Sequence, residues 1–439
     1  MKLENPVQNK PFKARRARLA KSLGEGIVIL PTAPERTRNA DAHYDYRWDS
    51  GFYYLTAFRE PEAVLVMVPG AKPRSILFCR EKNLEREIWD GFRYGPQLAA
   101  EVFGFDEAYP YGELDARMPD LIADQVSLHT PVGMDAAWDQ RVAGWLNAVR
   151  ARVRTGVTAP TEIRDVRAAI NDMRLVKDEF EVGIMRRAAE ISSNAHARAM
   201  RTAEPGMREY QVEAELMHEF IRNGARAPAY GSIVASGANA CVLHYRENTA
   251  ELRKGDLLLI DAGCELDSYA SDITRTFPVG ARFSQAQRDI YELVLESQEA
   301  AIKAVKPNAD FIDYHDAATR VLVEGLISFK LCKGSVDKVL EDGSYKQFYM
   351  HRTGHWLGLD VHDAGDYMQK GKWRKLKPGM VLTVEPGLYI RPADNVPKAF
   401  WNIGVRIEDD VLVTAKGREI LTADCPKRVK DVEDLVLAR

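Results

Sequence analysis

The sequence predicts a two-domain protein of the α/β class. The chain has 439 residues, which is more than one hydrophobic core usually serves. Over the first 175 residues, short apolar runs alternate with segments of helical spacing. Beyond that point two amphipathic helices come first, and strands that carry acidic residues follow. We therefore expect an N-terminal α/β domain over residues 1–175 and a second domain over residues 176–439.

The N-terminal domain shows both kinds of element. Residues 26–30, 63–68 and 75–79 are apolar or β-branched runs bounded by glycine, proline or charge, which is typical of strands. Residues 117–126 and 141–153 carry apolar residues at helical spacing. This alternation predicts strands and helices that pack in layers.

The second domain opens with two predicted helices. The first has acidic residues in its first turn and ends before Pro205-Gly206, and the second ends at Gly224. Apolar side chains recur every three or four positions along both, at Phe180, Ile184, Ala188, Ile191, Ala195 and Ala199, and then at Val212, Leu216 and Phe220.

Composition excludes several classes of protein. A net charge of −3 and a pI near 6.4 give no electrostatic reason to expect a nucleic acid or an anionic membrane as partner. No run reaches the ~18 apolar residues of a membrane span, and the charged stretch 1–24 lacks the apolar core of a signal peptide. The cysteines are odd in number and widely spaced, which predicts free thiols and a cytoplasmic location: Cys79, Cys241, Cys264, Cys332 and Cys425.

Four carboxylates stand where strands should be apolar. Asp261 closes the apolar part of the run 256–263, and Asp272 lies at the start of the run 271–279. Glu385 and Glu408 interrupt the runs 379–390 and 404–413. Burying an ionised carboxylate costs several kcal/mol unless it is paired or bound to metal. One such residue could face water from an edge strand. Four in one domain would repel one another strongly, and about two divalent cations would neutralise them.

The spacing of these residues predicts that their side chains come together in one site. Asp261 and Asp272 flank residues 262–271, which have the length and composition of a β-hairpin connection, and Glu385 and Glu408 flank a longer connection. The stretch "HRTGHWLGLDVHD" (351–363) adds three of the nine histidines, of which His355 can supply a nitrogen ligand. Such an oxygen-rich set suits Mn²⁺, and less exclusively Zn²⁺, Co²⁺ or Fe²⁺.

Competing motifs are incomplete. His351 and His355 have the spacing of a zincin helix, but Arg352 stands where that motif needs glutamate. There is no G-x-S-x-G elbow around a nucleophilic serine and no EF-hand loop.

Taken in order, four segments resemble the dinuclear metallopeptidases of pita-bread fold: "IDAGCELDSYASDITRTFPV", "HRTGHWLGLDVHD", "LTVEPGLYI" and "GVRIEDDVLV". Within that group, Asp360 and the long N-terminal domain most resemble the aminopeptidase P family, and the similarity extends through "DYRWDSGFYYLTAFREPEAVLV" and "EIWDG". The resemblance implies an N-terminal α/β domain with a mixed sheet. It also implies a C-terminal pita-bread catalytic domain, α+β, with a curved antiparallel sheet flanked by helices.

The resemblance also implies a ligand set. Asp261 would bind one metal, His355 and Glu385 the other, and Asp272 and Glu408 would bridge the two. A hydroxide held between the metals is the expected nucleophile, with Glu385 as proton acceptor.

Four further residues receive roles in the same way. The family's pattern assigns His244 and His362 to substrate binding and to stabilisation of the tetrahedral intermediate, and His351 and Arg406 to support of the site. Taken alone, His244 would more often be structural, and Arg406 beside Glu408 could be a plain ion pair.

Other positions are weaker matches. Asp360 and Asp363 are expected in turns or as supports of the ligands, and Tyr269 and Tyr389 are expected to pack near the site. Trp89 and Arg154 match positions that help define the peptide channel in the family, whereas Gly371 stands where a basic residue is expected.

The expected activity is removal of an N-terminal residue that precedes proline. The alternatives are a prolidase, which shares the fold and ligands but cleaves only Xaa-Pro dipeptides, and a non-catalytic binding protein on the same scaffold. All five ligand positions are filled, which argues against the latter. The family forms dimers and tetramers, so a homo-oligomer is expected.

Overall fold

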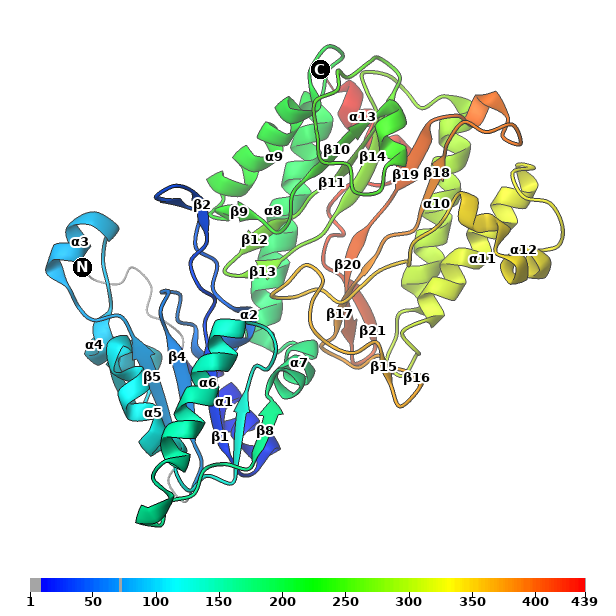
Figure 1. Cartoon of the computed structure of the whole chain (residues 1–439). Coiled ribbons are helices and arrows are strands. Elements are labelled where there is room, and N and C mark those ends of the chain that lie inside the picture. The colour runs from blue at the N-terminus through cyan, green and yellow to red at the C-terminus, as the bar shows by residue number, and fades with distance from the viewer. Residues whose placement is uncertain (1–8, 71–72, 439) are drawn as a thin grey trace. The chain divides into compact units, whose positions relative to one another are not determined.

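The computed structural model describes residues 9–70 and 73–438. The chain divides into two compact units between Arg174 and Leu175 (Figure 1). Residues 1–8, part of the charged N-terminal stretch considered above, lie outside the described residues.

A six-stranded sheet organises the first unit, in the order β6-β5-β4-β1-β7-β8. β1 runs antiparallel to β4 and parallel to β7, and β5 runs parallel to β6, so the sheet is mixed, as expected. Its strands are β1 (Ile27–Pro31), β4 (Val64–Val68), β5 (Arg74–Cys79), β6 (Glu107–Pro110), β7 (Ser127–Thr130) and β8 (Glu162–Asp165), and a separate small hairpin comprises β2 (Thr37–Asn39) and β3 (Ala42–His43).

Two helices of the unit pack on this sheet through a shared apolar core. Ile27, Val64 and Ile76 of the strands meet Met118 and Trp145 of the helices. The helices of the unit are α1 (Asn9–Leu23), α2 (Ser50–Thr56), α3 (Leu84–Asp90), α4 (Gly95–Phe103), α5 (Leu114–Ile122), α6 (Ala136–Arg150) and α7 (Arg167–Leu175), the last of which ends at the boundary between the units.

The second unit begins with the two predicted helices. The side chain of Asp178 accepts the backbone N–H of Glu181, and the side chain of Glu181 accepts that of Asp178, so α8 starts with a capping box. The helices are α8 (Glu179–Thr202), α9 (Glu209–Arg222), α10 (Gln285–Ala304), α11 (Asp313–Ser328), α12 (Val336–Asp342) and α13 (Val429–Leu437). α8 and α9 lie side by side, as do α10 and α11 (Figure 1).

Every strand pairing in the described part of the second unit is antiparallel. The strands form the sheets β10-β11-β14, β13-β12-β9, β17-β20-β21, β18-β19 and β15-β16. Their bounds are β9 (Ala227–Pro228), β10 (Ile233–Ser236), β11 (Leu257–Asp261), β12 (Cys264–Leu266), β13 (Tyr269–Ala270), β14 (Thr274–Pro278), β15 (Met368–Gln369), β16 (Lys372–Trp373), β17 (Val381–Val384), β18 (Gly387–Ile390), β19 (Ile403–Arg406), β20 (Asp409–Thr414) and β21 (Gly417–Ile420).

Two predicted strands are interrupted at their glutamates. The runs 379–390 and 404–413 each divide in two, at Glu385-Pro386 and at Ile407-Glu408. Pro386 has no N–H to contribute to a ladder, which accounts for the first break. Glu385 N–H donates instead to the carbonyl of Thr353 (2.8 Å), and Glu408 N–H to that of Thr274 (3.1 Å). Each glutamate therefore sits at a break between strands.

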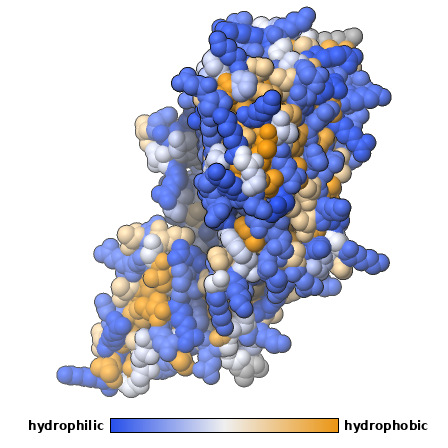
Figure 2. Space-filling view, turned by 90° about the vertical axis from the view of Figure 1, so that its right-hand side faces the viewer, coloured by the Kyte–Doolittle hydropathy of each residue, from blue (hydrophilic) through white to orange (hydrophobic). Residues whose placement is uncertain are grey.

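Figure 2 shows one face of the surface coloured by hydropathy. Hydrophilic residues cover most of the face shown in Figure 2, and hydrophobic residues gather there in a few limited patches. In the described residues, no helix combines the length and apolar character needed to cross a bilayer.

Candidate metal centre

A cavity of about 880 Å³ in the second unit contains the polar residues predicted from the sequence. Its walls come from the ends of strands and from the loop that follows η4 (Ser344–Gln347). All the residues expected to bind metal or substrate line it, namely His244, Asp261, Asp272, His351, His355, His362, Glu385, Arg406 and Glu408.

Strand pairing explains how the two aspartates meet. Asp261 is the last residue of β11 and pairs with Thr274, the first residue of β14. Asp272 lies two residues before β14, where its N–H donates to the Asp410 carboxylate (3.1 Å) in place of a strand partner. The connection between them forms the short strands β12 and β13. The expected hairpin geometry is present, with Asp272 just outside the strand.

His355 is oriented toward these carboxylates. Its Nδ1 lies 3.0 Å from the carbonyl of Trp356, which can only accept, so the proton is on Nδ1 and the Nε2 lone pair is left exposed to the cavity. That Nε2 lies 3.4 Å from Asp272 Oδ2 and 3.7 Å from Glu385 Oε1. A lone pair facing carboxylates requires a proton or a cation between them.

One atom of each of Asp272, His355 and Glu408 lies within 4.8 Å of the others, which is close enough for a shared metal ion. Two carboxylates with an imidazole, and the Glu385 carboxylate 3.7 Å from that imidazole, are a donor set suited to a divalent cation. The residues present therefore fit the expected metal.

Burial and neighbouring charges shift the pKa values of the site. Burial, followed by the charges of Asp272, Glu385 and Asp261, raises the pKa of Glu408 well above its usual value. Burial also raises the pKa of Glu385 to about 7, although His355 and Arg406 oppose the shift. Burial alone would lower the pKa of His355, but the hydrogen bond to Asp272 and the charge of Glu385 raise it to about 9. The raised pKa values mean that these side chains favour bound protons, and the same negative surroundings favour bound cations.

A chain of hydrogen bonds connects Asp261 with His351 in the lining of the cavity. Arg406 Nη2 donates to Asp261 Oδ2 (2.6 Å), and Arg406 Nη1 donates to the hydroxyl of Tyr389 (2.9 Å). His351 Nδ1 donates to the carbonyl of Arg352 (2.7 Å), so Nε2 accepts from Tyr389 (2.8 Å). Burial, and then the charge of Arg406, lower the pKa of His351 to about 4. His351 is therefore neutral at pH 7, and Tyr389 links it to Arg406.

The remaining histidines are more accessible. His244 and His362 are exposed, and the His362 ring stands edge-on to that of His355 at 4.4 Å between centroids. Burial and the charge of His355 lower the pKa of His362. Both rings can reach a molecule that enters the cavity.

Tyr230 was not singled out by sequence reasoning. Its hydroxyl donates to Asp261 Oδ1 (2.6 Å) and also bonds Asp272, so it joins two predicted ligands. It lies between β9 and β10, far from both aspartates in the sequence, and no local pattern marks it.

Asp363 lies behind the site, buried in an ion pair with Lys177 (2.8 Å). Asp360 N–H approaches the Asp363 carboxylate (3.4 Å), so both acids support the loop, as expected. Gly371 and Lys370 have positive φ and form the turn between β15 and β16.

Trp89 and Arg154 lie in the first unit, where both are exposed, Trp89 by 82 %. Their part in a peptide channel stays a prediction.

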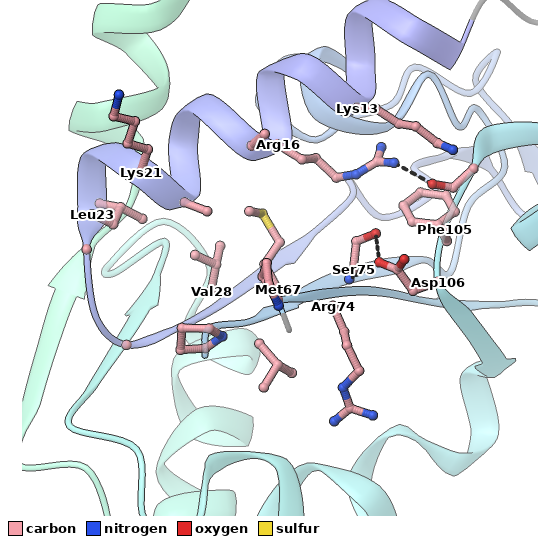
Figure 3. Close-up of a pocket in the computed structure, with 18 residues that line it drawn as sticks. Lys13, Arg16, Lys21, Leu23, Val28, Met67, Arg74, Ser75, Phe105 and Asp106 are labelled. Atoms are coloured by element: carbon pink, nitrogen blue, oxygen red, sulfur yellow. Dashed lines mark hydrogen bonds between the residues drawn. The ribbon is translucent and has the colours of Figure 1, made fainter. Parts of the chain in front are cut away.

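A second cavity, of about 460 Å³, lies in the first unit beside α1 (Figure 3). Several of its polar groups are engaged within the protein. Arg16 donates to the carbonyl of Gly104 (2.7 Å), and the N–H and hydroxyl of Ser75 donate to Asp106 (2.6 and 2.8 Å). Metal-binding geometry is found, in the part of the chain that the structure describes, only in the larger cavity.

Two family models match the chain. Metallopeptidase family M24 matches residues 183–415, which is more than half of the sequence, and the N-terminal domain of aminopeptidase P matches residues 12–129. The chain belongs to metallopeptidase family M24. The relationship anticipated from the motifs is thereby confirmed.

Several relatives of this M24 metallopeptidase are similar over nearly their whole length. The chain is 44% identical to the Xaa-Pro aminopeptidase of Escherichia coli strain K12, over 98% of each chain. It matches the structure of Pseudomonas aeruginosa aminopeptidase PepP with a TM-score of 0.97 and 48% identity, over 98% of each chain. The Zn-substituted Escherichia coli aminopeptidase P in complex with product gives a TM-score of 0.95 at 44% identity, over 99% of each. These matches confirm the two-domain α/β architecture with a pita-bread second domain.

Proposed function

We propose that this M24 metallopeptidase is a metal-dependent exopeptidase that releases the N-terminal residue from peptides with proline in second position. The observation that carries the proposal is the convergence of four carboxylates and His355 in one cavity, with His244, His351 and His362 on its walls. The name of the Escherichia coli relative, Xaa-Pro aminopeptidase, supports the choice of substrate.

Five residues would hold the metals. Asp261 is assigned to one ion, His355 and Glu385 to the other, and Asp272 and Glu408 to both. Bound there, two divalent cations would polarise the scissile carbonyl and activate a water at neutral pH. The preponderance of oxygen donors favours Mn²⁺ over softer metals.

The protein's own groups have distinct tasks. His244 and His362, both exposed, can donate hydrogen bonds to the peptide and to the oxyanion that develops on its carbonyl. Glu385 can take a proton on the carboxylate that faces His355 and His351, at 3.7 and 4.0 Å. Arg406 and Tyr389 keep His351 and Asp261 in place through the chain of hydrogen bonds described above.

The Xaa-Pro bond is a tertiary amide without an N–H. A peptidase that relies on that donor would bind it poorly, whereas carbonyl polarisation by a metal centre does not use it.

A prolidase would use the same centre for dipeptides alone. The decisive experiment compares an Xaa-Pro dipeptide with an Xaa-Pro-Yaa tripeptide and longer peptides, with turnover measured in Mn²⁺. The proposal predicts efficient release of Xaa from the tripeptide and longer chains. Cleavage of the dipeptide alone would replace it with the prolidase assignment, and no cleavage of either would favour a non-catalytic role.

The proposal also covers the oligomeric state, the cellular location and the domain boundary. A homo-oligomer is proposed by analogy with the family. A cytoplasmic location is proposed because all five cysteines are buried and free. The catalytic domain is proposed to span 176–439, with the N-terminal domain over 1–175.

A further inference from the structure

Arg352 and Arg246 are the two cationic side chains of the large cavity that form no ion pair in the described residues. Arg352 follows His351, is exposed, and lines the same cavity as Glu385 and His355. Within residues 9–70 and 73–438, no carboxylate forms an ion pair with it. Arg406 in the same cavity is by contrast committed to Asp261 at 2.6 Å, and Arg275 nearby is committed to Asp409 at 2.7 Å.

The Arg352 guanidinium is held in place by an aromatic side chain. Its central carbon lies 5.0 Å from the ring centroid of Trp373, within the range of a cation–π contact. Trp373 belongs to β16, is half-buried, and also lines the cavity. Stacking leaves the N–H fork free to bind an anion and reduces the entropy lost on binding. A planar fork with unused donors matches a carboxylate in shape and charge.

The cavity has room for more than a dipeptide. Its volume of about 880 Å³ is near the upper end of the ~300–1,000 Å³ typical of small-molecule sites. The carboxylates and His355 gather at one cluster. Arg352, three residues before His355, adds a charge to the lining, and Met368 and Trp373 of the β15–β16 hairpin add two apolar groups.

We propose that Arg352 is a specificity-determining residue that favours peptides bearing a carboxylate beyond the proline. The carboxylate could belong to an acidic side chain or to the C-terminus of a short peptide. The proposal rests on the function proposed above and adds a charge preference to it. A partly exposed ion pair of this kind corresponds to a preference of roughly two- to fivefold in kcat/KM.

The test is a matched peptide series. Peptides Ala-Pro-Yaa-Ala-amide and Ala-Pro-Ala-Yaa-amide, with Yaa as Asp or Asn, isolate the side-chain carboxylate. Ala-Pro-Ala with a free or an amidated end isolates the C-terminal carboxylate. The readout is the ratio of kcat/KM within each pair, since a ratio cancels any difference in the active fraction of a variant.

The wild type is expected to favour the charged member of at least one pair about two- to fivefold, and 0.5 M NaCl should reduce this ratio. Arg352→Gln should bring the ratio close to one, and Arg352→Glu should invert it. Lys372→Gln is the matched control, because it removes an exposed positive charge next to Trp373 and is expected to keep the wild-type ratio.

Three results would overturn the inference: ratios of one in the wild type, an unchanged ratio in Arg352→Gln, or an equal loss in Lys372→Gln. If the peptides are cleaved without charge preference, only Arg352's role is wrong. If none of them is cleaved, the proposed function fails as well.

Discussion

Lys177 and Asp363 show how single residues hold the histidine loop in place. Their charged groups lie 2.8 Å apart and both side chains are only 1 % exposed. Asp363 follows His362, and its N–H donates to the carbonyl of Trp356 (2.9 Å). A buried ion pair adds little net stability over apolar residues, but an unpaired partner is costly. The pair thus ties the loop of His355 and His362 to the segment before α8.

Replacing Lys177 by methionine should remove the buried positive charge that pairs with the Asp363 carboxylate. We expect a loss of about 3–5 kcal/mol in the free energy of unfolding, measured by urea denaturation. Lys375→Met breaks the exposed pair with Asp310 (2.9 Å) and serves as control, with an expected loss below about 1 kcal/mol. Equal stability of Lys177→Met and the wild type would show that the pair is not needed to hold the loop.

His196 predicts a pH dependence of stability. It is fully buried on α8, its Nε2 lies 2.9 Å from the carbonyl of Ala262, and burial lowers its pKa from 6.5 to about 4. Between these pH values the His196 imidazole is protonated in the unfolded chain and neutral in the folded chain. His196 therefore destabilises the fold increasingly as pH falls from 6.5 toward 4.

The stability of wild type relative to His196→Gln should therefore decrease over that range. Urea unfolding of the metal-free proteins at several pH values measures the difference, in which the opposing contributions of the metal-site carboxyls cancel. His218→Gln, exposed on α9, is the matched control. A difference that is constant with pH would contradict the assigned titration.

At the scale of elements, the strands place their acids at breaks and ends. Asp261 ends β11, Glu385 separates β17 from β18, and Glu408 separates β19 from β20. β20 contributes a further acid, Asp410, whose Oδ2 accepts the N–H of Asp272 (3.1 Å). At these positions the hydrogen bonds of the strand ladder are replaced by contacts that direct the carboxylates into one cavity.

Asp410→Ala should loosen Asp272 without removing a proposed ligand. Residues that orient metal ligands typically contribute 10- to 100-fold in affinity, so we expect a loss of about that size in Mn²⁺ affinity. Calorimetric titration of metal-free protein measures it. Glu419→Ala, on neighbouring β21 and half-buried in an ion pair with Arg186, should retain wild-type affinity. Undiminished affinity in Asp410→Ala would show that Asp272 is positioned by other contacts.

At the scale of the whole molecule, local patterns predicted more of the fold than of its contacts. Helical spacing and the signals at the helix ends predicted α8 and α9. Asp261 and Asp272 predicted a shared site because a hairpin connection brings its two ends together. The break at Glu385-Pro386 was missed because the apolar residues on its two sides together resemble one strand. Tyr230 and the Lys177–Asp363 pair were missed because only tertiary packing joins segments so distant in sequence.

The same convergence makes the protein's stability and activity depend on cations. Four carboxylates line one cavity, and Asp272, Glu385 and Glu408 have raised pKa values through burial, so bound divalent metal should favour the folded state.

The most direct test is a titration of chelator-treated protein with Mn²⁺ while release of the N-terminal residue from an Xaa-Pro-Yaa tripeptide is followed. We predict no turnover without metal and full turnover at about two ions per chain. Turnover that persists after metal removal, or a chain that binds no divalent cation, would contradict the metal centre assigned to this cavity.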